Sequence, residues 1–263
     1  MPPDMHSLAD DLTAETAVLR ALLADLDDAG WEAPTPAAGW AVRDQVSHLA
    51  HFDDAAVQSA TDPDAFRAGL AALVESGIDP DRIAEGYRDL APAALLDWFE
   101  TSRARLVAVF GDLDPGVRVP WYGPPMSAAS SLTARIMETW AHGQDVADTV
   151  GITREPTGRL RHVAHIGVRA LPFSYLLRDR AVPDVPVRVE LAAPDGGTWT
   201  WGPDDAADRV TGPALDFCLL VTQRRHRDDL ALEASGPVAT EWLSIAQAFA
   251  GAPGPGRPPG SPA

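Results

Sequence analysis

The residues of this chain best suited to chemistry are Glu138 and His142, in the segment Arg135–Asp145. They lie four positions apart, so an α-helix presents both side chains from one face, one turn apart. A carboxylate and an imidazole held together supply two of the three protein ligands that are typical of a catalytic divalent-metal site. The same spacing also suits an ordinary contact on a helix surface, so a third ligand has to decide between these interpretations.

His48 is the best candidate for that third ligand among the seven histidines. It lies in the middle of an expected helix, among apolar residues, and the helices of a bundle commonly share metal ligands across their core. His51, one turn further along, is an alternative ligand or a hydrogen-bond partner of one. His162 and His165 form a second pair on one helical face, for which a structural role is the simpler interpretation. A histidine on an apolar face is often an ordinary hydrogen-bonded core residue, so the pattern alone leaves the metal site open.

Three charged residues flank these candidates at helical spacing. Asp44, one turn before His48, and Asp145, close after His142, are candidates to accept hydrogen bonds from the imidazoles and so orient them. Arg135 precedes Glu138 by one turn and is placed to pair with a carboxylate. Four nearby aromatic residues are expected in the core or in a pocket wall: Trp40, Trp121, Tyr122 and Trp140.

The elements that must position these residues are four long amphipathic helices, as in an antiparallel bundle. The apolar periodicity predicts them over residues 5–30, 40–60 and 92–110, with a fourth that is capped by Ser127 or Ser130 and ends at Gly151. In the first helix Glu15 interrupts the apolar stripe. Residues 61–90 read as an insertion with short helical pieces at 63–76 and 80–88, and the loop 119–126 is expected to wall a pocket.

The pattern changes after Pro156. The expected elements are helices over 158–180 (interrupted near Pro172), 213–224 and 238–249, a hairpin of strands at 185–191 and 198–201, and a further strand at 230–233. We therefore predict an α+β protein: a four-helix bundle over residues 1–155, a smaller α+β domain over 156–250, and a disordered tail over 251–263.

Composition excludes several classes of function. The net charge of −17 argues against a nucleic-acid binder and against a protein that binds anionic membranes. The first ten residues contain no arginine and no apolar run, so we expect no signal peptide, no membrane span and a cytoplasmic location. The single cysteine, Cys218, lies in an apolar run and is expected to be a buried structural thiol. The expected partner is a small molecule, and the chain is expected to be a monomer or a homodimer.

Two segments together resemble a known family. The segments are Gly39–Leu49, which contains His48, and Arg135–Asp145. They are similar to the corresponding segments of mycothiol-dependent maleylpyruvate isomerases. That family is a branch of the DinB-like four-helix metalloproteins and is typical of actinobacteria. The resemblance covers residues 5–150 and implies a divalent metal held by His48, Glu138 and His142. Zinc is the usual metal, with nickel or iron as alternatives.

The resemblance extends more loosely to the second domain, which is similar to the sterol-carrier-like domain of the isomerase. An arginine of that domain takes part in the isomerase reaction, and Arg224 or Arg225 is the nearest equivalent here. The alternative for this arginine cluster is a solvated helix end that faces Asp228 and Asp229.

Three protein ligands leave at least one coordination position open, as in catalytic sites. We therefore expect a metal-dependent enzyme in which a thiol, mycothiol by resemblance, attacks a small electrophilic substrate, giving isomerisation or S-transfer. One alternative is a thiol-independent hydrolase, lyase or cyclase that uses the same metal. Another is a non-catalytic protein that binds a metal or a ligand.

Overall fold

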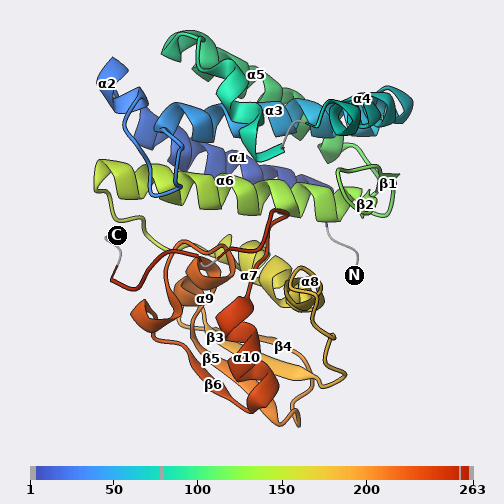
Figure 1. Ribbon diagram of the computed structural model, residues 1–263, viewed down its shortest axis with the longest axis vertical. Helices are drawn as coiled ribbons and strands as arrows, with labels where there is room; N and C mark the ends of the chain where they lie inside the picture. Colours follow the sequence, from blue (N-terminus) through green and yellow to red (C-terminus); the bar gives the residue numbers. More distant parts are fainter. Residues whose placement is uncertain (1–3, 78–79, 255, 261–263) are drawn as a thin grey trace. The chain divides into compact units, whose positions relative to one another are not determined.

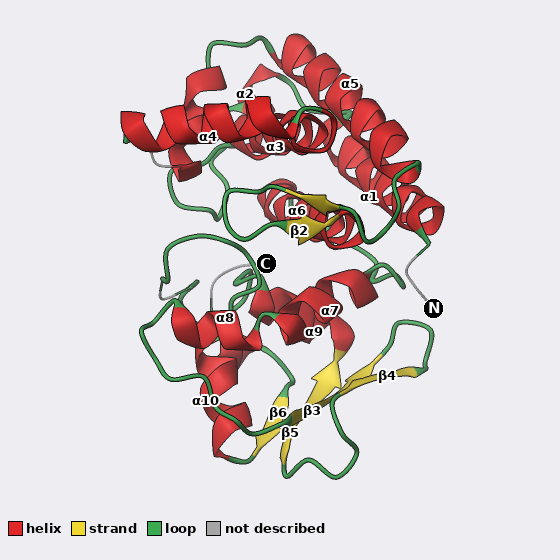
Figure 2. Cartoon of the chain, turned by 90° about the vertical axis from the view of Figure 1, so that its right-hand side faces the viewer, coloured by secondary structure: helices red, strands yellow, loops and turns green. Residues whose placement is uncertain are grey.

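The structure is a computed structural model that describes residues 4–77, 80–254 and 256–260. The chain divides into two compact units, Met1–Thr153 and Arg154–Ala263, which are described separately. The first is built almost entirely of helices, and the second combines helices with a sheet (Figures 1 and 2). The α+β fold class predicted from the sequence is confirmed. Among the described residues, no helix combines the length and the apolar character that crossing a membrane requires.

Four long helices form the N-terminal unit, as predicted: α1 (Met5–Leu23), α3 (Val42–Thr61), α5 (Pro92–Gly111) and α6 (Ala128–Val150). Helix α3 packs against α5 and α6, and α1 packs against the same two helices, so the four surround a common core (Figure 1). Ser127 caps α6 by accepting a hydrogen bond from the amide of Ser130, and Gly151 ends the helix in the left-handed region at φ 71°.

The first helix is shorter than expected. It ends at Leu23, and a separate short helix, α2 (Asp28–Trp31), begins after Asp27, whose carboxylate accepts a hydrogen bond from the amide of Gly30 at 2.8 Å. The prediction of one helix over 5–30 is therefore wrong at its C-terminal end. A new N-cap at Asp27 explains the interruption.

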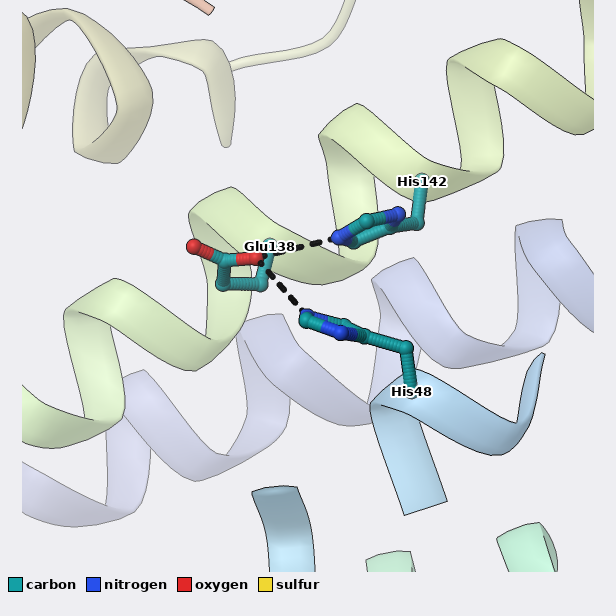
Figure 3. A group of neighbouring side chains, drawn as sticks. All are labelled: His48, Glu138 and His142. Carbon is teal, nitrogen blue, oxygen red and sulfur yellow. Dashed lines mark hydrogen bonds and ion pairs between the residues drawn. The ribbon is translucent and has the colours of Figure 1, made fainter. Parts of the chain in front are cut away.

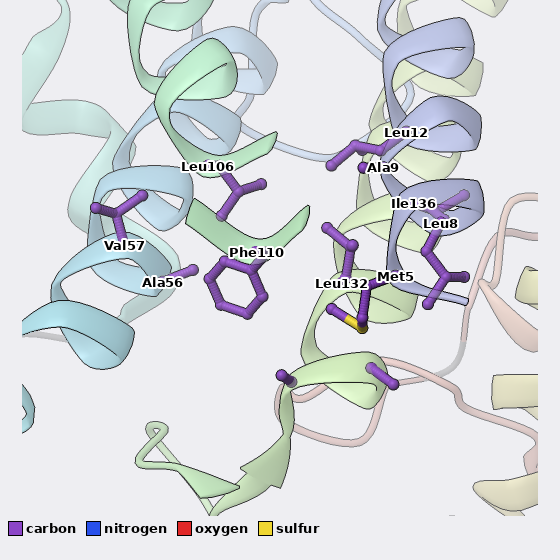
Figure 4. Packing of buried hydrophobic residues seen from close by; sticks show 12 residues of the cluster. Met5, Leu8, Ala9, Leu12, Ala56, Val57, Leu106, Phe110, Leu132 and Ile136 are labelled. Atoms are coloured by element: carbon purple, nitrogen blue, oxygen red, sulfur yellow. The ribbon is translucent and has the colours of Figure 1, made fainter. Parts of the chain in front are cut away.

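Among the described residues, the core of the bundle includes two large apolar clusters and a smaller one around Phe52 and Phe66. Of the two large clusters, one contains Met5, Leu12 and Phe110 and is drawn in Figure 4, and the other contains Leu19 and Phe99. Between the members of these clusters along α1, α3 and α5 lie buried polar residues, namely Glu15, Thr16, Asp53, Ser102 and Arg103. Charged groups thus occupy the middle of the bundle, beside the residues of the candidate site.

The predicted insertion over residues 61–90 folds as helix α4 (Pro63–Ser76) and the 3₁₀-helix η1 (Pro80–Tyr87), while residues 78–79 lie outside the described residues. Phe66 is the buried residue of α4, and its ring stacks on Trp121 with the centroids 6.0 Å apart. Trp121 belongs to the loop between two short strands, β1 (Arg118–Val119) and β2 (Met126–Ser127). The aromatic loop therefore holds the insertion against the bundle.

The C-terminal unit contains a four-stranded sheet with the order β4-β3-β5-β6. Its strands are β3 (Val187–Ala192), β4 (Thr198–Trp201), β5 (Asp208–Pro213) and β6 (Glu233–Ser235). Strands β3 and β4 form the predicted antiparallel hairpin, β3 and β5 are parallel, and β5 and β6 are antiparallel. The helices are α7 (Leu160–Arg169), α8 (Leu171–Leu176), α9 (Ala214–Val221), η2 (Arg227–Asp229) and α10 (Pro237–Ile245).

Several details of this unit differ from the predictions. The helix expected over 158–180 is interrupted at Ala170, as predicted near Pro172, because Pro172 lies in the first turn of α8, where its missing amide costs no hydrogen bond. It ends earlier than predicted, at Leu176. Strand β5 was not predicted, and β6 lies slightly later than the strand expected at 230–233. Of the predicted disordered tail, residues 255 and 261–263 lie outside the described residues, and the amide of Gly260 donates to the carboxylate of Asp229 at 2.9 Å.

Candidate metal centre

Three side chains from two helices converge at the candidate site. Helix α3 presents His48, and α6 presents Glu138 and His142 one turn apart (Figure 3). Glu138 Oε2 lies 3.1 Å from His142 Nε2 and 3.6 Å from His48 Nε2. One donor atom from each residue lies within 4.8 Å of the other two, close enough for a single ion to contact all three. The structure thus brings together the three residues that the sequence singled out.

Aromatic rings surround the three side chains. The Trp40 ring stacks on His142 at an interplanar angle of 12°, with the centroids 5.7 Å apart, and Phe52 packs on His48 at 4.6 Å. The side chains of His48 and Glu138 are 15% and 18% exposed, so the cluster is only partly accessible to solvent. Trp40 also lines a surface cleft of about 350 Å³ with Arg43.

Burial and mutual contacts set the charge of the cluster. Burial and the neighbouring His142 lower the pKa of His48 to about 3, so this imidazole is neutral at pH 7. Burial alone would raise the pKa of Glu138, but the contacts of its carboxylate with His142 and His48 and the charge of Arg135 outweigh burial and hold that pKa well below its ordinary value. A neutral imidazole and an ionised carboxylate are the forms that bind metals.

The partner of His142 Nδ1 is a residue that the sequence did not single out. Gln45 Oε1 lies 2.5 Å from this nitrogen. The role suggested for Asp44 is wrong, because its carboxylate accepts from the amide of Ala41 at 2.8 Å and from Arg88 at 2.9 Å. In the sequence, Gln45 is recognisable only as a polar residue one turn before His48, and that position does not indicate that it contacts His142.

His51 is engaged elsewhere. Its Nδ1 lies 2.9 Å from the hydroxyl of Tyr87, and the cluster of donor atoms contains His48 instead. Of the second histidine pair, His165 Nδ1 accepts a hydrogen bond from the indole of Trp201 at 3.3 Å, in the C-terminal unit. Among the described residues, this leaves His48, Glu138 and His142 as the candidate ligand set.

Buried charges extend from the site into the bundle core. Arg135 Nη2 lies 3.9 Å from Glu138 Oε2, so the predicted pairing of this arginine with a carboxylate is present, and its Nη1 lies 3.8 Å from Asp53 Oδ1. The other oxygen of Asp53 accepts from Arg103 Nε at 2.6 Å, and Arg103 donates to the hydroxyl of Thr16 at 2.5 Å. We call Thr16, Asp53, Arg103 and Arg135 the polar belt. It links α1, α3, α5 and α6 directly beside the candidate ligands.

The two arginines suggested as catalytic lie in the C-terminal unit, just after α9. Arg224 Nη1 donates to the carbonyl of Thr222 at 2.7 Å, and Arg225 Nη1 donates to the carbonyl of Arg224 at 2.6 Å. Their catalytic role stays a prediction. Cys218 is fully buried, its Sγ lies 3.4 Å from the carbonyl oxygen of Leu160, and burial raises its pKa far above the ordinary range.

The donor set suits a divalent transition metal. Two imidazole nitrogens and one carboxylate form a combination found in catalytic zinc sites and in non-haem iron sites. Three protein ligands leave room in the coordination shell for a small molecule. The arrangement can therefore activate a bound thiol, water or carbonyl group.

Comparisons with known proteins agree with this architecture. A family model described as "Mycothiol maleylpyruvate isomerase N-terminal domain" matches residues 12–147, and a second model described as "Wyosine base formation" matches residues 183–235. Uncharacterised proteins from two Mycobacterium tuberculosis strains, CDC 1551 and H37Rv, are 47% identical over 94% of this chain and 96% of their own length.

Two solved structures share the fold. They are crystal structures of the mycothiol-dependent maleylpyruvate isomerase and of a histidine-to-alanine mutant of that enzyme, with TM-scores of 0.56 and 0.55. Each match covers 84% of this chain and 89% of the other, at 17% sequence identity. At that identity the likeness concerns the fold alone.

Proposed function

The chain belongs to the mycothiol maleylpyruvate isomerase family, and on that premise we propose that it is a metal-dependent enzyme that uses a thiol, mycothiol, to isomerise a small electrophilic substrate or to transfer sulfur to it. The observation that carries the proposal is the convergence of His48, Glu138 and His142 within 4.8 Å. Zinc is the metal we propose for this site.

Each residue of the site has a distinct part in this proposal. His48 and His142 bind the metal through Nε2, the nitrogen that each turns toward Glu138. Glu138 binds as a carboxylate, kept ionised by its neighbours, including Arg135. A divalent metal in this position supplies Lewis acidity, which lowers the pKa of a thiol that binds beside it. The rings of Trp40 and Phe52 shield the ligands from bulk water.

The thiol has to come from outside the chain. Cys218 is the only cysteine, it is fully buried, and burial raises its pKa, so it forms no thiolate near pH 7. An external thiolate that adds to an electrophilic carbon and later leaves the same carbon regenerates the free thiol, and rotation in between isomerises the substrate. The family description supports mycothiol as this thiol.

Arg224 or Arg225 completes the proposed reaction by holding a substrate carboxylate or by stabilising negative charge that develops during addition. A guanidinium presents two parallel N–H groups to a carboxylate, which orients a small acid as well as binding it. Support for this role comes from the resemblance of the second domain to the sterol-carrier-like domain of the isomerase, in which an arginine takes part in the reaction. Replacing Arg224 and Arg225 with alanine one at a time should lower turnover in at least one of the two variants and leave the zinc content of both unchanged.

The first experiment measures the metal content of the full chain. Wild type, His48→Ala and the matched control His51→Ala are purified, and their metal content is determined by elemental analysis. We expect about one zinc per chain in wild type and in the His51 variant, and loss of zinc in the His48 variant. Equal metal content in all three proteins would remove His48 from the site.

The second experiment tests the reaction. Mycothiol binding is measured by calorimetry on zinc-loaded and metal-free protein, and turnover is followed with maleylpyruvate as the first probe. Thiol binding that depends on zinc supports the proposal. Turnover without any thiol would favour a hydrolase, lyase or cyclase. A coordination shell closed by a fourth protein side chain would favour a non-catalytic binding protein.

A further inference from the structure

A series of hydrogen bonds connects the loop before α3 to the candidate ligand His142. The hydroxyl of Thr35 lies 2.8 Å from the carbonyl oxygen of Trp40. Gln45 Nε2 lies 2.8 Å from the same hydroxyl oxygen, and Gln45 Oε1 lies 2.5 Å from His142 Nδ1. Two residues outside the ligand set, Thr35 and Gln45, are therefore coupled to one nitrogen of a ligand.

The chemistry of these groups gives every hydrogen bond a direction. A carbonyl oxygen only accepts, so the hydroxyl of Thr35 donates its single hydrogen to Trp40. The Thr35 oxygen must then accept from Gln45, which turns the NH₂ group of that amide toward Thr35 and its oxygen toward His142. An amide oxygen also only accepts, so Nδ1 of His142 must carry a hydrogen.

The loop that begins this series has a defined conformation. The amide of Thr35 donates to the carbonyl of Trp40 at 2.8 Å, and the amide of Val42 donates to the carbonyl of Ala33 at 3.1 Å. The Trp40 ring at the end of the loop stacks on the face of His142. The loop thus constrains the imidazole both through its Nδ1 edge and through its face.

We propose that Thr35 and Gln45 are positioning residues that keep Nδ1 of His142 protonated and aim Nε2 at the metal. This inference rests on the proposed metal site. Nε2 is the nitrogen that faces Glu138, at 3.1 Å, so the direction of the hydrogen bonds agrees with the nitrogen required for binding. Hydrogen-bond partners of this kind fix the tautomer and the ring orientation of a histidine ligand.

Zinc affinity tests the proposal. Thr35→Val removes the hydroxyl at nearly constant volume, Gln45→Leu removes the amide, and Thr35→Ser retains the hydroxyl as the matched control. Affinity is measured on the full chain by competition with a chromophoric chelator, after circular dichroism has shown that each variant is folded. We expect the valine and leucine variants to bind zinc about 10- to 100-fold more weakly than wild type. The serine variant should bind within a factor of about three of wild type, the usual scatter of such effects when the hydrogen bond is kept.

A second measurement reads the hydrogen bond itself and needs no variant. Histidine-selective ¹H–¹⁵N NMR of zinc-loaded wild type should show a protonated Nδ1 on His142 whose hydrogen exchanges slowly with water. In Thr35→Val that hydrogen should exchange faster, because the amide of Gln45 is no longer held in one orientation. A His142 Nδ1 without a hydrogen in wild type would overturn the proposal even if every variant failed to fold.

The outcomes separate this inference from the proposed function. Wild type that binds no zinc would overturn the metal site and, with it, the positioning role. Wild type that binds zinc, together with Thr35→Val and Gln45→Leu variants of equal affinity, would overturn the positioning role alone. Weakened binding in Thr35→Ser as well as in Thr35→Val would also overturn it, since the serine hydroxyl can make the same hydrogen bonds.

Discussion

Replacing Asp53 with asparagine should destabilise the N-terminal unit more than any conservative change on its surface. Asp53 is fully buried, Arg103 Nε lies 2.6 Å from one of its oxygens, and Arg135 Nη1 lies 3.8 Å from the other. Asparagine keeps the shape of the side chain and removes its charge. Two guanidinium groups, on residues that are 3% and 4% exposed, would then share the core without this carboxylate.

The size of the effect follows from these contacts. Opposite charges about 4 Å apart attract by about 4 kcal/mol at the effective dielectric constant of about 20 that suits protein sites. Removing one partner of a buried ion pair costs about 3–5 kcal/mol in measured cases. Because Asp53 faces two cations, we expect a loss near the upper end of that range, a large part of the usual stability of about 5–15 kcal/mol.

The assay has to separate the two units. Hydrogen exchange followed by mass spectrometry across a urea series gives unfolding free energies for peptides of α3 and α6, and peptides of β3 and β5 serve as an internal control. Asp54→Asn is the matched variant: Asp54 is half-buried, it accepts from the indole of Trp98 at 2.7 Å, and asparagine keeps an acceptor there. We expect that variant to cost about 1 kcal/mol or less.

A cost for Asp53→Asn no greater than that for Asp54→Asn would refute this reasoning. It would mean that the guanidinium groups of the polar belt find other partners or reach water when the carboxylate charge is lost. A loss confined to the sheet peptides would refute it as well, because Asp53 lies in the helical unit.

Three further results are expected. The pKa of His48 is about 3 in the folded protein against an ordinary value of 6.5, so metal-free folded protein binds fewer protons than the unfolded chain between these values. Its stability should therefore fall as pH falls through this window, by up to about 1.4 kcal/mol per pH unit, and urea unfolding of His48→Gln should show a flatter dependence. Phe66→Ala removes the buried ring of α4 and its stack on Trp121, so amide exchange of residues 63–76 should accelerate; unchanged protection would contradict the anchoring role. Gly236→Ala forces a side chain into φ 89°, with its Cβ 2.4 Å from Asp208 Oδ1. Strands β5 and β6 should then lose at least about 1–2 kcal/mol of stability by the same exchange measurement, and an undiminished value would argue against this close approach.

The sequence was most informative where a long periodic pattern carried the signal. The apolar positions of α3 and α6 identify both helices, and the spacing of Glu138 and His142 then places two side chains on one face. His48 was accessible to the same reasoning because it interrupts an apolar face in mid-helix. That the three residues bind a metal stays a proposal.

Contacts between distant segments were beyond such reasoning. Gln45 meets His142 only because α3 packs against α6, and its orientation depends on Thr35 in a loop. Arg135 was expected to pair with a carboxylate one turn away, but Asp53 lies on another helix and leaves no local signal. Periodicity describes one element at a time, whereas these hydrogen bonds arise from tertiary packing.

Strand β5 escaped prediction for a different reason. Its segment, Asp208–Pro213, contains one large apolar residue, Val210, and ends in glycine and proline, which are uncommon in strands. Pairing with β3 on one side and β6 on the other stabilises it, and neither partner is adjacent in the sequence. Gly212, at φ 144°, adopts a backbone conformation that other residues rarely reach, and a Cβ there would lie 2.6 Å from the carbonyl oxygen of Ala231.

The composition of the ligand set has a consequence for oxidative stress. Imidazole and carboxylate ligands do not undergo the stepwise oxidation that inactivates cysteine-ligated centres, and the one thiol of the chain is enclosed in the C-terminal unit. In the proposed reaction the component exposed to oxidants is then the external thiol, whose disulfide is restored by reduction. Peroxide should therefore halt turnover reversibly. Replenishing the thiol should restore activity without any synthesis of new protein.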